Sequence, residues 1–241
     1  MTQPRYRLLQ AREADEPTRA EEHAAFADKL GIEVEAIESF DLLTEAPSFH
    51  RVTDGVDAVL VGGSGRFGIN DDTPWMPAFI EVLGELAAHD FPTFASCFGF
   101  QGLVVALGTD VVNDPSRSEV GTYEVYTRPE GHADPVFRIL PPSFDAQMGH
   151  KDSATDLPAG ATHLVSSPRC PYQAIRLGRS VYATQFHPEL SRADNRHRFT
   201  RYMVEYSEVF GPEKAQEMLD AFRPSPEAEQ LLPAFARVVL G

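Results

Sequence analysis

The sequence predicts an α/β fold in which a doubly wound, mostly parallel sheet carries helices on both faces. Three observations predict it. Short apolar runs alternate with helical stretches through the first half of the chain, a rhythm typical of parallel sheets. The middle instead carries short strand-like runs between proline and glycine turns, which indicates a small antiparallel section. From about residue 192 the pattern becomes helical again and predicts a C-terminal tail.

Each expected element has a local signal at its ends. Gly31 and Gly108 end the first and third helices, and Thr73 before Pro74 is a suitable N-cap for the second. Ser225 is a good start for the last helix. The expected strands of the first half are residues 7–11, 32–37, 56–61 and 92–96, and the expected helices are 17–30, 74–89 and 98–107. Later strands are expected at 121–128, 161–166, 174–177 and 181–185.

Length and charge limit the classes of protein. The 241 residues are expected to form one catalytic domain over residues 1–190, with a helical extension over 191–241 packed on it. The chain has 21 Lys and Arg against 36 Asp and Glu, a formal net charge of −15. Such a surface repels phosphate backbones, so nucleic acid is not an expected partner.

Cysteine usage and hydropathy predict a cytoplasmic protein. Only Cys97 and Cys170 occur, too few for a disulfide framework, and the N-terminus has no apolar signal region. Residues 91–109 carry no charge and approach the length of a membrane span. Pro92, Gly99 and Gly102 interrupt that stretch, so a strand followed by a helix is expected there, and no membrane contact.

Cys97 stands where the apolar run 92–96 meets the helix expected from residue 98. A sharp strand-to-helix turn presents such a side chain at the carboxyl edge of a parallel sheet, where open α/β folds bind ligands. The positive end of the following helix favours the thiolate. The alternative is a buried structural cysteine.

A nucleophilic cysteine needs a base and a group that orients the base. His187 and Glu189 follow the strand expected at 181–185, and residues two apart on extended backbone point the same way. A carboxylate next to an imidazole can fix its tautomer and stabilise its protonated form. Taken alone, the pair could also be a surface His and Glu at a strand end.

Two segments, 95–101 (Ala-Ser-Cys-Phe-Gly-Phe-Gln) and 185–189 (Gln-Phe-His-Pro-Glu), together resemble the class I (triad) glutamine amidotransferases. Residues 62–64 (Gly-Gly-Ser) stand where that family has a Gly-Gly-Pro turn. Residues 148–152 (Met-Gly-His-Lys-Asp) resemble the Ser-His-Gly-Asp segment of GMP-synthase glutaminase domains. The resemblance spans roughly residues 56–190 and implies a flavodoxin-like sheet.

The resemblance assigns roles residue by residue. Cys97 would be the nucleophile, His187 the base and Glu189 its partner. The backbone N–H groups of Gly63 and Phe98 would form the oxyanion hole. The substrate-binding residues would be Gln101, Gly149, His150, Lys151 and Asp152.

A dinucleotide site and a metal site are weaker interpretations. Residues 63–68 match G-x-G-x-x-G, but the chain continues as loop rather than opening a helix, and no acidic residue ends the next strand. His150 and Asp152 could join His187 and Glu189 around a metal, but this leaves Cys97 unexplained. We therefore expect no cofactor and no metal.

The implied activity is hydrolysis of the side-chain amide of glutamine to glutamate and ammonia, with a separate synthase chain receiving the ammonia. A γ-glutamyl peptide hydrolase with the same triad is the rival enzyme. A triad-bearing binding or regulatory protein without catalysis is the rival from another class. A homo-oligomer stays open, and the arginines at 192, 196, 198 and 201 are a solvated helix face or a docking surface.

Overall fold

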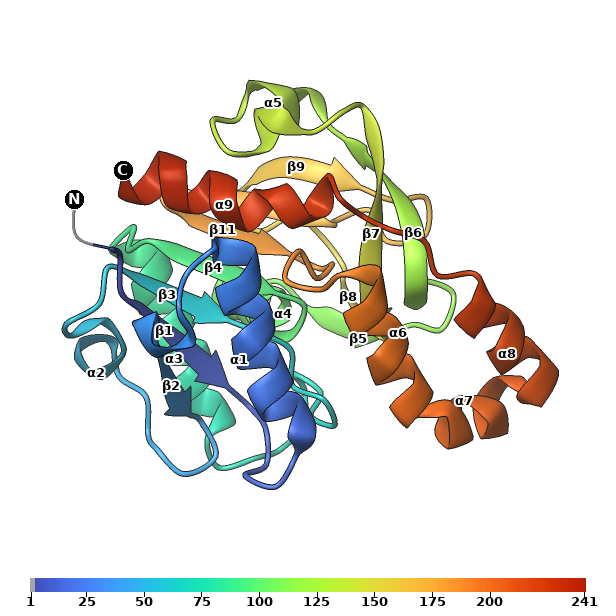
Figure 1. Ribbon diagram of the computed structural model, residues 1–241. Helices are drawn as coiled ribbons and strands as arrows, with labels where there is room; N and C mark the ends of the chain where they lie inside the picture. Colours follow the sequence, from blue (N-terminus) through green and yellow to red (C-terminus); the bar gives the residue numbers. More distant parts are fainter. Residues whose placement is uncertain (1–2) are drawn as a thin grey trace.

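A nine-stranded sheet runs through the centre of the molecule (Figure 1). The computed structural model describes residues 3–241, with all side chains there except those at positions 205 and 209. The strands of this sheet lie in the order β2-β1-β3-β4-β11-β10-β9-β6-β7. Their bounds are β1 (Tyr6–Gln10), β2 (Ile37–Asp41), β3 (Ala58–Val61), β4 (Thr93–Ser96), β6 (Glu119–Thr127), β7 (Ser143–His150), β9 (Thr162–Ser166), β10 (Ala174–Leu177) and β11 (Val181–Thr184).

The sheet has a parallel half and an antiparallel half. From β2 to β11 every neighbouring pair is parallel. From β11 to β7 every pair is antiparallel. A separate two-stranded ribbon pairs β5 (Val111–Asn113) with β8 (Asp152–Ala154). The predicted α/β class, with a mixed sheet flanked by helices, is confirmed.

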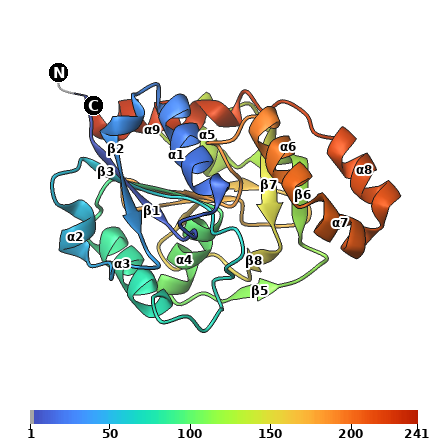
Figure 2. The same ribbon diagram turned by 60° about the horizontal axis from the view of Figure 1, so that its bottom comes forward.

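Helices cover both faces of the parallel half (Figure 2). Alternation along each strand divides the core in two, because successive side chains of a strand point to opposite faces. Leu8 packs with α1 and α9, whereas Leu9 packs with α3 and α4. The helices are α1 (Pro17–Leu30), α2 (Phe49–Thr53), α3 (Met76–Ala88), α4 (Phe98–Ala106), α5 (Pro129–Ala133), α6 (Arg192–Arg201), α7 (Met203–Phe210), α8 (Pro212–Asp220) and α9 (Leu231–Phe235).

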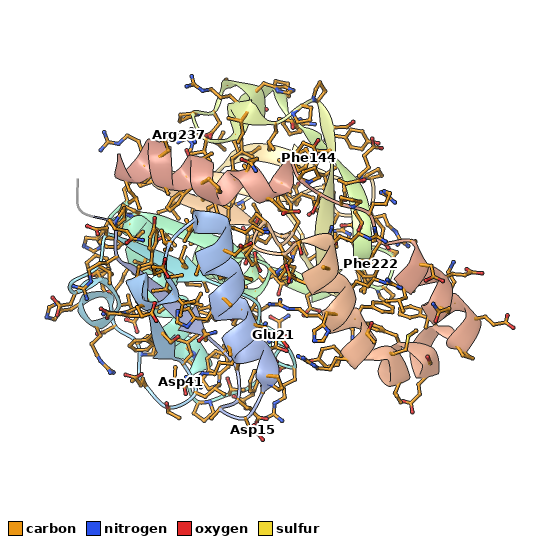
Figure 3. All side chains as sticks on the ribbon, viewed as in Figure 1. Asp15, Glu21, Asp41, Phe144, Phe222 and Arg237 are labelled. Carbon is orange, nitrogen blue, oxygen red and sulfur yellow. The ribbon has the colours of Figure 1, made fainter. Side chains whose placement is uncertain are left out.

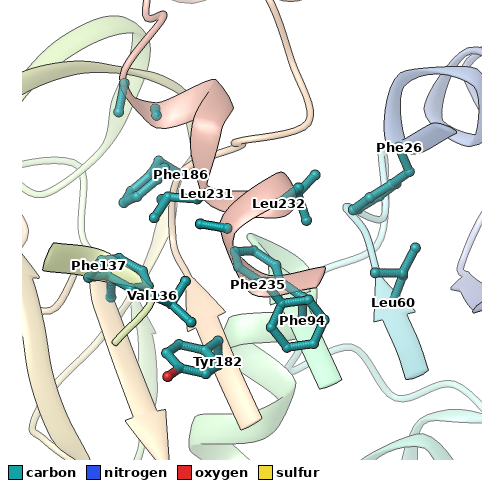
Figure 4. Packing of buried hydrophobic residues seen from close by; sticks show 14 of the residues in the cluster. Phe26, Leu60, Phe94, Val136, Phe137, Tyr182, Phe186, Leu231, Leu232 and Phe235 are labelled. Carbon is teal, nitrogen blue, oxygen red and sulfur yellow. The ribbon is translucent and has the colours of Figure 1, made fainter. Parts of the chain in front are cut away.

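The C-terminal segment contributes to both the core and the periphery. Phe235 of α9 lies between Phe94 and Tyr182, with ring centroids 5.5 and 5.9 Å away (Figure 4). Arg201 of α6 donates at 2.6 Å to Glu21 of α1, which is labelled in Figure 3. The predicted division at residue 190 stays a prediction, since the tail shares the main core. In residues 3–241 no helix is long and apolar enough to cross a membrane.

Several expected boundaries are confirmed and two are wrong. α1 spans the predicted residues, and Gly31 ends it at φ 66° with its N–H bonded to the last turn. The second strand begins at Ile37, because a 3-10 turn (Val34–Ala36) occupies its predicted start. Thr73 does not cap α3, which starts three residues later after Trp75. The last helical segment starts with a 3-10 turn (Ala228–Gln230) and ends in a π-helical turn (Ala236–Leu240).

Gly99 allows α4 to lie directly on β3. A Cβ at position 99 would come within 2.7 Å of the Cβ of Val61, closer than real Cβ atoms approach. The Gly99 N–H also donates to the carbonyl of Gly62 at 3.3 Å. The first turn of α4 is thereby held against the loop that follows β3.

Gly99→Ala should therefore destabilise the protein, by about 1–3 kcal/mol for an overpacked core site. Urea unfolding followed by circular dichroism measures the change. The matched control is Gly84→Ala in α3, whose added Cβ would lie 3.8 Å from that of Ala106. Alanine is the better helix former, so the control should be neutral or stabilising. Equal free energies of unfolding for the two variants would contradict the packing argument.

Candidate active site

Cys97 occupies a single-residue turn between β4 and α4. β4 ends at Ser96 and α4 begins at Phe98. Cys97 has φ 52° and ψ −99°, a backbone conformation that residues with a side chain rarely adopt. Its N–H donates to the carbonyl of Thr184 at 2.8 Å, which ties the strained turn to the end of β11. Cys97 as a residue is only partly buried.

His187 and Glu189 reach the same edge of the sheet in the turn that follows β11, and not on the extended backbone that the sequence predicted, since the Leu190 N–H donates back to the His187 carbonyl at 3.3 Å. Because β11 runs parallel to β4, with Thr184 opposite Ser96, the chain leaves both strands side by side. The Nδ1 atom of His187 lies 2.6 Å from Oε1 of Glu189, and Cys97 is close enough for its sulfur to raise the pKa of His187. Glu189 is fully buried. The three predicted triad residues are thus brought together.

The charges around His187 keep its imidazole protonated. Burial alone would lower the pKa of His187, but the carboxylate of Glu189 and the sulfur of Cys97 outweigh burial and raise this pKa to about 10. At neutral pH the group therefore holds an imidazolium between a carboxylate and the cysteine. An imidazolium at this position can stabilise a thiolate and can protonate a leaving group.

The loop after β3 that contains Gly62 and Gly63, called the glycine loop below, borders the triad and also contacts Glu22. A Cβ at Gly63 would lie 3.4 Å from Cε1 of His187, so this backbone passes directly beside the base. The Gly63 N–H donates to Oε1 of Glu22 at 3.0 Å. Phe98 opens α4, so its N–H belongs to the helix turn that has no intrahelical acceptor. Of the two predicted oxyanion donors, the Gly63 N–H is therefore bonded to Glu22, whereas the Phe98 N–H has no acceptor within its helix.

Gln101 is buried one turn into α4 and its side chain already has partners. Its Nε2 donates to the carbonyl of Asp152 at 3.0 Å and to Oε1 of Gln185 at 3.3 Å. Gln185 in turn places its own Nε2 3.8 Å from Sγ of Cys97. A chain of two amides therefore connects Cys97 to the segment around Asp152.

That segment, residues 149–152, approaches the triad mainly through backbone. A Cβ at Gly149 would lie 3.7 Å from Nε2 of His187. The His150 ring is buried, with Nε2 3.0 Å from Glu119 and Nδ1 3.0 Å from the carbonyl of Asp152. Lys151 is exposed. The Asp152 carboxylate accepts from Asn113 at 2.8 Å. The predicted roles of these residues toward a substrate stay predictions.

A second Cys, His and Glu group lies apart from the triad. The candidate metal-ligand atoms of Glu119, His150 and Cys170 lie within 4.8 Å of one another. Burial and the nearby Glu119 raise the pKa of the Cys170 thiol to about 12, which keeps it protonated and unreactive. Both Glu119 oxygens already accept hydrogen bonds, from Ser167 at 2.7 Å and from Gln173 at 2.5 Å. The group is accounted for as a buried polar network to which His150 of residues 149–152 belongs.

Sequence reasoning missed two residues of this site. Gln185 had a signal, since it precedes His187 by two positions on a strand end. Glu22 had none, because it looks like any charged residue of an amphipathic helix and its partner Gly63 is 41 positions further along. Only the tertiary contact of α1 with the glycine loop reveals it.

Comparisons with known proteins point to one family. A family model for the class-I glutamine amidotransferases matches residues 27–204. The chain is 33% identical over 135 residues to "GMP synthase [glutamine-hydrolyzing]" of Thermosipho africanus, covering 56% of this chain and 24% of that protein. It is 30% identical over 164 residues to the same-named protein of Thermosipho melanesiensis, covering 68% and 29%. The chain thus spans about a quarter of the length of these relatives.

Solved structures support the fold. A glutamine amidotransferase of Thermotoga maritima superposes with a TM-score of 0.73 at 20% identity, covering all of both chains. A glutamine amidotransferase of Methylobacillus flagellatus gives a TM-score of 0.67 at 18% identity, covering 98% of this chain and 95% of that one. At these identities the likeness concerns the fold alone.

The geometry predicts that Glu189→Gln lowers the pKa of His187. The neutral amide cannot stabilise the imidazolium, so burial dominates and the proton leaves well below pH 10. NMR titration of the labelled histidine rings measures this pKa, with the resonance assigned from a His187→Asn sample. The result expected for the wild-type protein is a ring that stays charged until about pH 10. An unchanged pKa in the variant would show that Glu189 does not hold the charge.

Proposed function

The chain belongs to the class-I glutamine amidotransferase family, and on this basis we propose that it hydrolyses the side-chain amide of glutamine through a thioester on Cys97. The observation that carries the proposal is the proximity of Cys97 to a His187 that Glu189 keeps charged. The strained turn at Cys97 and the partial exposure of this residue support the nucleophilic role.

The proposed first step forms the thioester. The Cys97 thiolate attacks the amide carbon of glutamine, and the carbonyl oxygen becomes an oxyanion. The N–H of Phe98 faces this oxygen, and the N–H of Gly63 joins it when free. The imidazolium of His187 then gives its proton to the departing nitrogen, so ammonia leaves and the glutamyl thioester remains.

The second step releases glutamate. Neutral His187 takes a proton from water, the hydroxide oxygen attacks the thioester carbon, and the thiolate leaves with His187 protonated again. One glutamine and one water thus become glutamate and ammonia. We propose that residues 149–152 and Gln101 shape the pocket for the amino-acid end of glutamine, with Gln101 acting through its link to Gln185.

We further propose that a synthase consumes the ammonia. The two curated relatives are named GMP synthase, which makes GMP formation the first reaction to test. The assay supplies glutamine as the only nitrogen source to an ammonia-dependent GMP synthase, with and without this chain. GMP formation that requires the chain supports this acceptor, and no formation despite glutamine hydrolysis would exclude it.

Cys97→Ala should abolish glutamine hydrolysis, with a fall in kcat of at least ~10³-fold, because it removes the atom that forms the thioester. Coupled detection of glutamate measures the rate, and circular dichroism checks that the fold is kept. The matched control is Cys170→Ala, which removes the other, protonated cysteine and should retain the activity. Equal turnover by Cys97→Ala and the wild type would refute the mechanism.

The same assay distinguishes glutamine hydrolysis from the rival activity, hydrolysis of γ-glutamyl peptides. Glutamine and a γ-glutamyl dipeptide are offered to the wild-type protein at equal concentrations. A higher kcat/KM for glutamine supports the amidotransferase-type activity. A higher value for the dipeptide would assign the triad to a γ-glutamyl peptide hydrolase instead.

A further inference from the structure

Glu22 presents a buried carboxylate to the loop that should bind the oxyanion. Its side chain lies on α1 and is fully buried. Oε1 accepts from the Gly63 N–H at 3.0 Å and from Arg12 at 2.9 Å, while Oε2 accepts from Gln10 at 3.2 Å. The donor that the proposed reaction needs is therefore already bound to an anion of the protein itself.

The charge of Glu22 is maintained although its side chain is fully buried. Burial would raise the pKa of Glu22, but the guanidinium of Arg12 outweighs burial and lowers it. Arg12 is itself buried and also pairs with Glu16 at 2.8 Å. Arg198 of α6 adds a second positive charge near Glu22. The carboxylate is thus an ionised, strong acceptor at neutral pH.

The absence of side chains in the glycine loop leaves room for this carboxylate. A Cβ at Gly62 would lie 2.5 Å from Oε1 of Glu22, so only glycine lets the loop come this close. One residue further on, a Cβ at Gly63 would lie 3.4 Å from the His187 ring. The peptide that borders the catalytic base is therefore the one whose N–H is taken by Glu22.

Resting on the proposed function, we propose that Glu22 is a positioning residue that limits the rate of the reaction by holding the Gly63 N–H away from the oxyanion. The carboxylate and the oxyanion are two anions that compete for one donor. The reaction gains this donor only when the hydrogen bond between Glu22 and Gly63 opens. Oxyanion donors act mainly in the transition state, so the effect falls on kcat rather than on KM.

Glu22→Gln tests the competition directly. The neutral amide is a weaker acceptor of almost the same shape, so Gly63 is released more easily. We expect kcat for glutamine to rise by roughly 10-fold, given that one oxyanion donor is worth ~10²–10³ in kcat, with KM nearly unchanged. The matched control is Glu21→Gln, the preceding residue of α1, which pairs with Arg201 at the surface and should leave kcat within about twofold. An unchanged or lowered kcat in folded Glu22→Gln overturns the proposal.

A second measurement tests the proposal even if the Glu22→Gln variant fails to fold. In wild-type protein labelled with ¹⁵N-glycine, the Gly63 amide is followed while the aldehyde analogue of glutamine forms its adduct on Cys97. We expect the Gly63 resonance to move as the adduct oxygen replaces Glu22 as acceptor. An adduct that leaves this resonance in place overturns the proposal. Failure of the proposed function looks different, since neither wild-type protein nor Glu22→Gln would then turn over glutamine or form the adduct.

Discussion

The parallel pairing of β4 with β11 is the interaction on which the site depends. These strands are far apart in the chain, yet their register sets Ser96 opposite Thr184. The hydrogen bond from the Cys97 N–H to Thr184 extends this pairing by one residue into the turn. Cys97 therefore follows the end of β4 directly, and His187 lies three residues beyond the end of β11 at the same edge. Residues this close to strand ends are held more rigidly than residues on long loops.

The charged side chains around this edge of the sheet determine the protonation state of the site. Glu189 is buried behind His187, so its charge acts at short range in a low-dielectric environment and keeps the imidazolium. The same physics applies at the loop after β3, where the buried Glu22 carboxylate, paired with Arg12, accepts from the Gly63 N–H. The positive charge of Arg198 on α6 acts on both Glu22 and Glu189, so the C-terminal segment contributes to the electrostatics of the site.

The sequence predicted what local patterns determine. The run before Cys97, the helix after it and the strand before His187 were each visible in a few neighbouring residues, and these placed the triad at one edge. Boundaries set by turns were predicted less well, as at Thr73, where an N-cap residue lies outside the helix. The strand β7 was missed because its residues look irregular until β6 pairs with them. Glu22 was missed because its role exists only through contact with a distant loop.

The central claim is that Cys97 carries the glutamyl group during turnover. The most direct measurement is rapid acid quenching of the protein during reaction with ¹⁴C-glutamine, followed by digestion and peptide mapping. The account predicts radiolabel on the peptide that contains Cys97, released by hydroxylamine as a thioester would be. Turnover of glutamine with no label on that peptide, or label on the peptide that contains Cys170, would contradict it.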